Sequence, residues 1–156
     1  MIDLRGAGRS ACEVIRALDL RPHPEGGHFR ETSRDVAPGG GRGTMSAILF
    51  LLALDEFSHW HRVDADELWI WQAGGPLVLS VSPDGHDASA HWLGPDLSAR
   101  QSLQHRVPAG HWQAANSLGQ WTLVSCVVAP AFSFDGFELA PPDWRPVPRA
   151  AAPGRR

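Results

Sequence analysis

The sequence of 156 residues contains no lysine and no tyrosine, and it has only two cysteines. Without lysine, the chain cannot form a Schiff base or build the lysine-containing loop that binds phosphates in many nucleotide hydrolases. Without tyrosine, one common general acid is missing. Cys12 and Cys126 lie far apart in the sequence and match no metal-binding or redox spacing, so we interpret both as reduced thiols.

The chain also lacks a basic excess and long apolar runs. Its formal net charge is −3, so it has no surplus of cations to contact the phosphates of a nucleic acid. The longest apolar run, residues 47–54, is far too short to span a bilayer, and the first ten residues contain no apolar signal region. We therefore expect a cytoplasmic protein that binds neither nucleic acid nor membranes.

The length fits one domain that buries enough surface to fold without a disulfide or a metal. We expect this domain to span residues 10–140. Residues 1–9 form an N-terminal extension, and residues 141–156 form a tail rich in proline and arginine that carries no apolar period. This composition predicts that the tail is poorly ordered.

One segment has the pattern of a helix. Ser10 is a suitable N-cap, and Glu13 three residues later completes a capping box. One helical face then carries apolar side chains from Ala11, Val14, Ile15 and Leu18. The sequence therefore predicts a single short N-terminal helix.

The rest of the sequence has the pattern of β-structure. Short runs rich in β-branched or aromatic residues alternate with glycine and proline turns, and no long helical patterns separate them. The clearest runs are residues 45–54, 67–72, 76–81, 104–107 and 121–128. This spacing predicts an all-β sandwich or barrel and argues against a doubly wound α/β sheet.

Residues 58–71 contain the densest group of chemically active side chains. Because side chains alternate along a strand, His59 and His61 are expected to share one face. After a turn, Glu67, Trp69 and Trp71 share one face of the next strand. A hairpin would bring two imidazoles and a carboxylate together, an arrangement that resembles a facial triad for a divalent metal.

A second stretch follows a turn that contains Pro108 and Gly110. On the strand after this turn, His111 and Gln113 are expected to point one way and Trp112 the other.

These motifs resemble those of the cupin superfamily. The His-x-His pair followed by Glu67 and Gly74 is similar to the first cupin motif, and Pro108, Gly110 and Gln113 are similar to the second. The stretch His-Pro-Glu-Gly-Gly at residues 23–27 resembles a family of small single-domain cupins, largely uncharacterised and often labelled predicted sugar epimerases. The resemblance covers about residues 10–140. It implies a double-stranded β-helix, or jelly roll, with a pocket inside the barrel, and a homodimer.

Two features depart from the general cupin pattern. Five residues separate His61 from Glu67, where the usual spacing is three or four, and Gln113 stands where the second motif usually has a histidine ligand. An amide is a poorer ligand for zinc or iron than an imidazole. A divalent metal (zinc, iron, manganese or nickel) held by His59, His61 and Glu67, with waters completing its shell, is one alternative.

The first functional hypothesis is an isomerase or epimerase without an obligatory metal. His61 would be the general base, oriented by Glu67 or Asp66, because an imidazole titrates near neutrality. Arg30 would bind an anionic group of a small polar ligand. The other expected substrate contacts are Trp69, Trp71, His111, Trp112 and Gln113.

Two further hypotheses stay open. A metal-dependent cupin, such as a dioxygenase, a decarboxylase or another lyase, would use His59 as a ligand. A binding module without catalysis would use the aromatic barrel alone. The stretch at residues 23–27 is expected to be a turn that admits a strand to the barrel, with Glu25 at the rim of the pocket as the less favoured interpretation.

Overall fold

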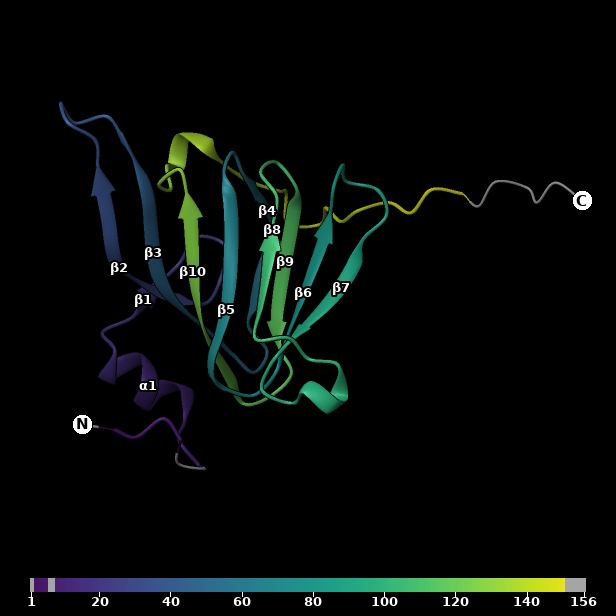
Figure 1. Ribbon diagram of the computed structural model, residues 1–156. Helices are drawn as coiled ribbons and strands as arrows, with labels where there is room; N and C mark the ends of the chain where they lie inside the picture. The colour runs from purple at the N-terminus through teal and green to yellow at the C-terminus, as the bar shows by residue number, and fades with distance from the viewer. Residues whose placement is uncertain (1, 6–7, 151–156) are drawn as a thin grey trace, which may run out of the picture.

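A computed structural model describes residues 2–5 and 8–150. Within these residues the chain forms two antiparallel sheets that face each other (Figure 1). The first sheet contains, in spatial order, β1 (Arg21–Pro22), β2 (His28–Val36), β3 (Arg42–Ala53), β10 (Trp121–Ala129), β5 (Asp66–Gly74) and β8 (Gln104–Val107). The second contains β11 (Phe137–Leu139), β4 (Phe57–Val63), β9 (Trp112–Ser117), β6 (Leu77–Ser82) and β7 (Ser89–Leu93).

This arrangement confirms the predicted all-β fold with one short N-terminal helix. Each of the clearest apolar runs of the sequence lies within or overlaps a strand, namely β3, β5, β6, β8 and β10. The long strand β2 has no such run, because its residues beyond Phe29 are exposed. Its position is fixed by pairing with β3 and not by an apolar pattern of its own.

The main core lies between the two sheets. Inward-facing side chains of β3, β5, β6 and β10 interdigitate there, among them Phe50, Trp69, Leu79 and Val124. Each is almost fully buried, and burial of such a side chain stabilises the fold by roughly 1.5–3 kcal/mol. This core fills one end of the space between the sheets.

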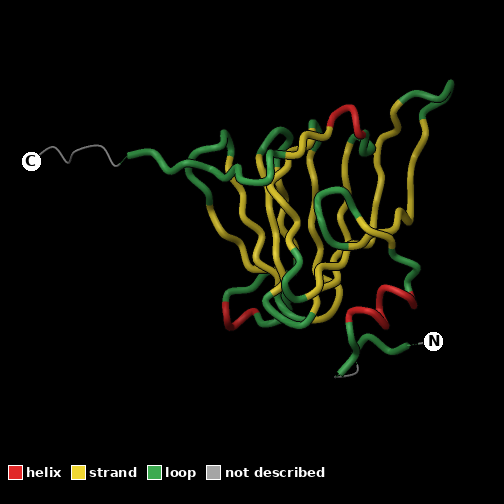
Figure 2. The backbone as a smooth tube through the Cα atoms, turned by 180° about the vertical axis from the view of Figure 1, so that it is seen from behind, coloured by secondary structure: helices red, strands yellow, loops and turns green. Residues whose placement is uncertain are grey.

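The helix α1 (Ala11–Ala17) has the capping box that the sequence predicts. The Ser10 hydroxyl accepts a hydrogen bond from the Glu13 backbone, and the Glu13 carboxylate accepts one from the Ser10 backbone at 2.8 Å. Its apolar face packs against Leu51, Leu123 and Trp121 on the outer face of the first sheet. Two short 3-10 helices, η1 (Leu97–Ala99) and η2 (Phe134–Gly136), complete the described elements, with η2 at the end of the molecule opposite α1 (Figure 2).

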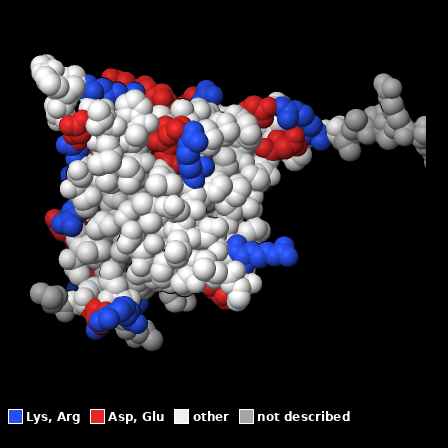
Figure 3. All heavy atoms as spheres, viewed as in Figure 1, with Lys and Arg blue, Asp and Glu red and all other residues white. Residues whose placement is uncertain are grey.

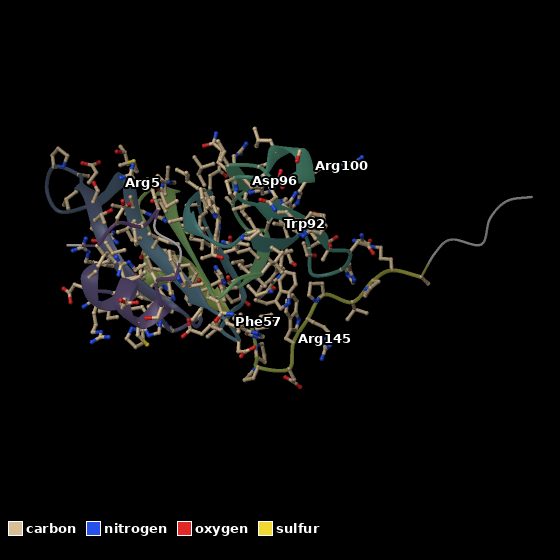
Figure 4. The ribbon with its side chains drawn as sticks, turned by 90° about the horizontal axis from the view of Figure 1, so that it is seen from below. Arg5, Phe57, Trp92, Asp96, Arg100 and Arg145 are labelled. Atoms are coloured by element: carbon tan, nitrogen blue, oxygen red, sulfur yellow. The ribbon has the colours of Figure 1, made fainter. Side chains whose placement is uncertain are left out.

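Residues 141–150, part of the segment expected to be a poorly ordered tail, run along the outer face of the second sheet. The Trp144 ring lies 4.4 Å from that of Trp112, and Arg149 forms ion pairs with Asp84 and Asp87. Phe57 and Arg145, which line a groove beside this segment, lie on the same side of the molecule (Figure 4). The rest of the expected tail, residues 151–156, lies outside the described residues.

The surface carries charges of both signs. On the face seen in Figure 3, arginine side chains lie beside acidic ones, and a broad area carries neither. Among the residues that the structure describes, no helix has both the length and the apolar character needed to cross a membrane.

The turn at residues 23–27 fixes how the chain enters β2. Gly26 and Gly27 have positive φ angles of 108° and 71°, which other residues rarely adopt. A Cβ atom on Gly26 would also collide with the Phe57 carbonyl of β4, so this turn fits against β4 only with glycine. The close approach places the preceding residue, Glu25, between the sheets.

We predict that Gly26→Ala destabilises the protein much more than Gly39→Ala does. Both glycines have positive φ angles, of 108° and 84°, but a Cβ on Gly39 meets no atom within 4 Å. The collision at Gly26 should therefore add about 1–3 kcal/mol to the loss of unfolding free energy. Urea unfolding of both variants measures this difference, and equal losses would contradict the close approach of this turn to β4.

Candidate functional site

A cavity of about 200 Å³ lies between the sheets at the end that carries η2. Its lining combines titratable side chains with apolar ones. The titratable group is His23, Glu25, His61, Glu67 and Cys126. The aromatic group is Phe29, Phe50, Phe132, Phe134 and Phe137. Arg21, Glu31 and Arg34 stand at its exposed rim, and Ser46, Ile48, Val63 and Val128 complete the wall.

A β-bulge in β4 turns His61 into the cavity. The pairing of β4 with β9 shifts register between Ser58 and His61, so two residues separate these inward-facing side chains. Ser58, His61 and Val63 are all nearly fully buried, whereas His59 is only partly so. The expectation that His59 and His61 share one face is therefore wrong, because a bulge breaks the alternation of the strand.

The Glu25 carboxyl group lies beside the His61 ring. Its Oε1 accepts a hydrogen bond from the Ser58 hydroxyl at 2.8 Å, and its Oε2 lies 3.3 Å from His61 Nε2. The Glu25 backbone carbonyl accepts a hydrogen bond from the His59 amide at 2.8 Å, which ties the turn to β4. Burial raises the pKa of Glu25, and the nearby His23 ring partly offsets this effect.

The surroundings of His61 define its tautomer. Its Nδ1 lies 2.7 Å from the His59 carbonyl oxygen, and because a carbonyl can only accept, Nδ1 carries the hydrogen. In the neutral ring Nε2 is then an unprotonated acceptor that faces Glu25 and the cavity. Burial lowers the pKa of His61, an effect that the neighbouring Glu67 carboxylate opposes. His61 is therefore held as a neutral imidazole with its basic nitrogen directed inward.

Glu67 reaches the same cavity from β5. Its Oε2 accepts a hydrogen bond from the Gln113 amide at 2.6 Å, and Gln113 Oε1 accepts one from Trp69 Nε1 at 2.8 Å. These two hydrogen bonds fix the orientation of the Gln113 amide, whose NH₂ group donates to Glu67. Burial raises the pKa of Glu67 to about 7, while the His61 ring acts in the opposite direction. At neutral pH the carboxyl group is close to half protonated.

Two further titratable groups line the cavity. The His23 ring packs edge-on against Phe29, and its Nδ1 accepts a hydrogen bond from the Glu25 backbone at 3.2 Å. Burial lowers the pKa of His23. Burial also raises the pKa of the Cys126 thiol, and the carboxylates of Glu67 and Glu25 add to that increase. Cys126 is therefore a neutral thiol in the cavity wall.

The predicted metal triad of His59, His61 and Glu67 does not form. His59 Nε2 lies 2.9 Å from the Pro141 carbonyl oxygen, on the outer side of β4, away from the cavity. Within residues 2–5 and 8–150, no group of three histidine, cysteine or acidic side chains is arranged to hold a metal ion. The residues of this site therefore do not fit the metal centre that the cupin resemblance implies.

The three tryptophans expected to stack on a substrate lie outside the cavity lining. Trp69 is buried in the main core behind Glu67. Trp71 donates its indole hydrogen to the Gly75 carbonyl, near the other end of β5. Trp112 lies on the face of β9 opposite Gln113, with the Arg62 guanidinium 4.7 Å from its ring centroid. The aromatic wall consists of phenylalanines instead.

The other candidates divide in the same way. Gln113 points inward and contacts Glu67, as its position on β9 suggested. Arg30 is exposed, because the cavity-lining residues Phe29 and Glu31 flank it on β2 and alternation places it on the opposite face. His111 precedes β9 and does not line the cavity, and Asp66 pairs with Arg106 at the surface.

The structure adds residues to the site that the sequence patterns did not favour. Glu25 is the carboxyl group beside His61, although the favoured interpretation of its stretch is a turn, with the rim of the pocket as the less favoured one. The two consecutive glycines after it were the available signal, since they mark a backbone that approaches another strand closely. The phenylalanines at residues 132, 134 and 137 follow the last long strand, where no periodic pattern points to a cavity.

Comparison with solved structures places this fold among known ones. The chain is 36% identical to a protein of Shewanella oneidensis, with a TM-score of 0.79 over 85% of each chain. It is 31% identical to a hypothetical protein from Leishmania major, with a TM-score of 0.74 over 83% of this chain and 86% of that one. Oxalate decarboxylase from Bacillus subtilis matches at 13% identity and a TM-score of 0.59, over 78% of this chain and 30% of that one, which shows the fold alone.

No curated protein matches the chain. A family model described as Cupin superfamily (DUF985) matches residues 12–140, which include the turn that carries Glu25, both strands that carry His61 and Glu67, and the phenylalanine segment. With this match and the jelly-roll fold, the chain belongs to the DUF985 family of the cupin superfamily.

Proposed function

We propose that this protein is a proton-transfer enzyme of the isomerase or epimerase class, which acts on a carbon atom next to a carbonyl group. The observation that carries the proposal is the pair formed by His61 and Glu67 in one cavity. Burial lowers the pKa of the imidazole and raises that of the carboxyl group to about 7. Near neutral pH one group is an unprotonated base and the other holds a proton, as acid–base catalysis requires.

In the proposed reaction His61 Nε2 takes the proton from the substrate carbon. Glu67 gives its proton to the carbonyl oxygen at the same time, so that the C–H electron pair enters the enol. His61 then carries a positive charge and Glu67 a negative one. These charges attract each other in an apolar cavity, and the net charge of the site is unchanged. Return of a proton to the other face of that carbon or to a neighbouring carbon, with the enol hydroxyl proton passing back to Glu67, completes the isomerisation.

Glu25 and Gln113 have positioning roles in this scheme. The His59 carbonyl orients the His61 ring through Nδ1, and the Glu25 carboxyl group lies beside Nε2. The separation of 3.3 Å from Glu25 is longer than a strong charge-assisted hydrogen bond, so Nε2 stays open to a substrate. Gln113, itself fixed by Trp69, holds the Glu67 carboxyl group in place. These contacts supply the orientation that proton transfer needs.

We predict that His61→Gln abolishes the proton exchange that the wild-type protein catalyses. Removal of a general base costs about 10²–10⁴-fold in rate. The assay is the loss of α-proton NMR signals from a panel of carbonyl compounds in deuterated water. His105→Gln, which changes a histidine outside the cavity lining, serves as the control and should exchange at the wild-type rate.

Two outcomes would count against this function. If His61→Gln exchanges substrate protons as fast as the wild type, His61 is not the base. If compounds bind to the wild type but none exchanges or reacts, the protein is a binding module. Wild-type protein treated with a chelator should keep its activity. Within residues 2–5 and 8–150, no three histidine, cysteine or acidic side chains are arranged to hold a metal ion.

We also predict that kcat/KM falls as the pH rises through about 7. Glu67 must hold its proton to act as the acid, and its pKa of about 7 sets the alkaline limb of the profile. The acidic limb lies below the ordinary histidine pKa, since burial lowers the pKa of His61. In Glu67→Gln the alkaline limb near pH 7 should disappear along with most of the rate, whereas persistence of that limb would assign it to another group.

The same carboxyl group should make stability depend on pH. Glu67 binds its proton more tightly in the folded protein, so its stabilising effect is complete below about 4.5 and is lost as the pH rises to about 7. At about 1.4 kcal/mol per pKa unit, the unfolding free energy of wild type relative to Glu67→Gln should fall by up to about 3 kcal/mol across this range. Denaturant unfolding of both proteins at several pH values measures it, and parallel curves would show that Glu67 is not buried.

A further inference from the structure

The size of the cavity limits what can react at His61 and Glu67. Its volume is about 200 Å³. An apolar cavity of about 150 Å³ holds benzene, whereas pockets for drug-sized ligands and cofactors run from about 300 to 1,000 Å³. The cavity therefore has room for a compound about the size of a small bicyclic ring system. It is too small to enclose a nucleotide.

Much of the remaining cavity wall is aromatic, and it adjoins the acid–base groups, since the Phe137 and His61 ring centroids lie 5.6 Å apart. Phe132, Phe134 and Phe137 pack edge-on against one another, with ring centroids 5.0–5.9 Å apart. Phe29 and Phe50 extend this wall from the first sheet. Phenylalanine rings bind hydrocarbon and aromatic groups and offer no hydrogen bond to a hydroxyl group.

Two of the polar groups near this wall have hydrogen-bond partners within the protein. The Ser46 hydroxyl accepts a hydrogen bond from the Phe132 amide at 2.9 Å, and Gln113 holds one oxygen of Glu67. His61 Nε2 stays open to a ligand, but it lies among the acid–base groups. A polyol could bond to those groups, whereas its hydroxyl groups against the phenylalanine wall would lose their hydrogen bonds to water without replacing them.

The charges at the cavity disfavour an anionic ligand. Arg34 at the rim is held by Glu31 through two hydrogen bonds of 2.9 and 2.7 Å and donates a third to the Phe132 carbonyl. Arg21 stands at the rim with its guanidinium over the Phe29 ring, far less enclosed than the two carboxyl groups at the base. A negative charge buried in this cavity would lose its hydration, and any ionised fraction of Glu25 and Glu67 would repel it.

We propose that the substrate is an uncharged and mainly apolar carbonyl compound, not a sugar, a nucleotide sugar or an anion. Its carbonyl group meets His61 and Glu67, and its hydrocarbon part packs against the phenylalanine wall. The proposed acid–base function supplies the reason for the carbonyl group, whereas the apolar character rests on the cavity alone. This ligand differs from the polar, anionic one that the sequence and Arg30 suggest.

The test compares 2-indanone with D-xylulose, two ketones with the same number of non-hydrogen atoms and with exchangeable α-protons. Calorimetric titration should show that 2-indanone binds the wild-type protein at least about tenfold more tightly than D-xylulose does, because only the sugar must give up hydrogen bonds to water. Indane-2-carboxylate should also bind at least about tenfold more weakly than 2-indanone, because of the buried carboxyl groups. Tighter binding of D-xylulose or of the carboxylate, or binding of none of the three, would overturn the proposal.

A variant pair locates the binding. Val128→Phe adds bulk to the cavity wall and should abolish 2-indanone binding, whereas Val36→Phe makes the same change at a residue that is 60% exposed and should leave it intact. If Val128→Phe is unstable, a shift of the His61 ring ¹⁵N signals on addition of 2-indanone gives the same information in the wild type. Equal 2-indanone binding by both variants, or no shift of the His61 signals, would overturn the location.

Deuterium exchange at the α-carbons of the bound ketone separates this inference from the proposed function. Exchange of 2-indanone that is lost in His61→Gln supports both. Binding of 2-indanone without exchange supports the apolar ligand class and contradicts the proposed acid–base function toward this ligand. Exchange of D-xylulose in preference to 2-indanone keeps the acid–base function and overturns the apolar substrate.

Discussion

The burial of two imidazoles and two carboxyl groups in one apolar cavity is the constraint on which the site depends. Water would hold these groups at their ordinary pKa values, whereas burial penalises whichever form is charged. It lowers the pKa of His61 and raises that of Glu67 to about 7. The fold thus turns an ordinary histidine and glutamate into a base and an acid that coexist near neutral pH.

Two local departures from regular β-structure make this burial possible. The bulge in β4 turns His61 inward, whereas simple alternation would place it on the same outer face as His59. The positive φ angles of Gly26 and Gly27 let the preceding turn lie against β4. Together they bring Glu25 to 3.3 Å from His61. Both devices cost local stability, and the main core at the other end of the sheets compensates for it.

Much of the fold could be predicted because it rests on local patterns. The capping box of Ser10 and Glu13 predicts the start of the helix, and apolar runs predict strands such as β3 and β10. Within the candidate site, the inward positions of Glu67 and Gln113 follow from alternation in short strands, whereas that of His61 depends on the bulge in β4. A bulge leaves no apolar signature, and a change of one residue in phase moves a side chain to the other face, which is why the pattern puts His59 in a metal site. The pattern also does not show which end of the space between the sheets a side chain reaches, so it assigns Arg30 and the tryptophans to a pocket that phenylalanines line.

NMR titration of the protein labelled with ¹⁵N in its histidines and ¹³C in its glutamate carboxyl groups reads the protonation state of the site itself. At neutral pH the His61 ring should be neutral, with its hydrogen on Nδ1 and none on Nε2, and the Glu67 carboxyl carbon should titrate near pH 7. A hydrogen on Nε2 of a neutral His61 ring, together with a Glu67 that titrates near its ordinary value of 4.5, would contradict an acid–base pair in this cavity.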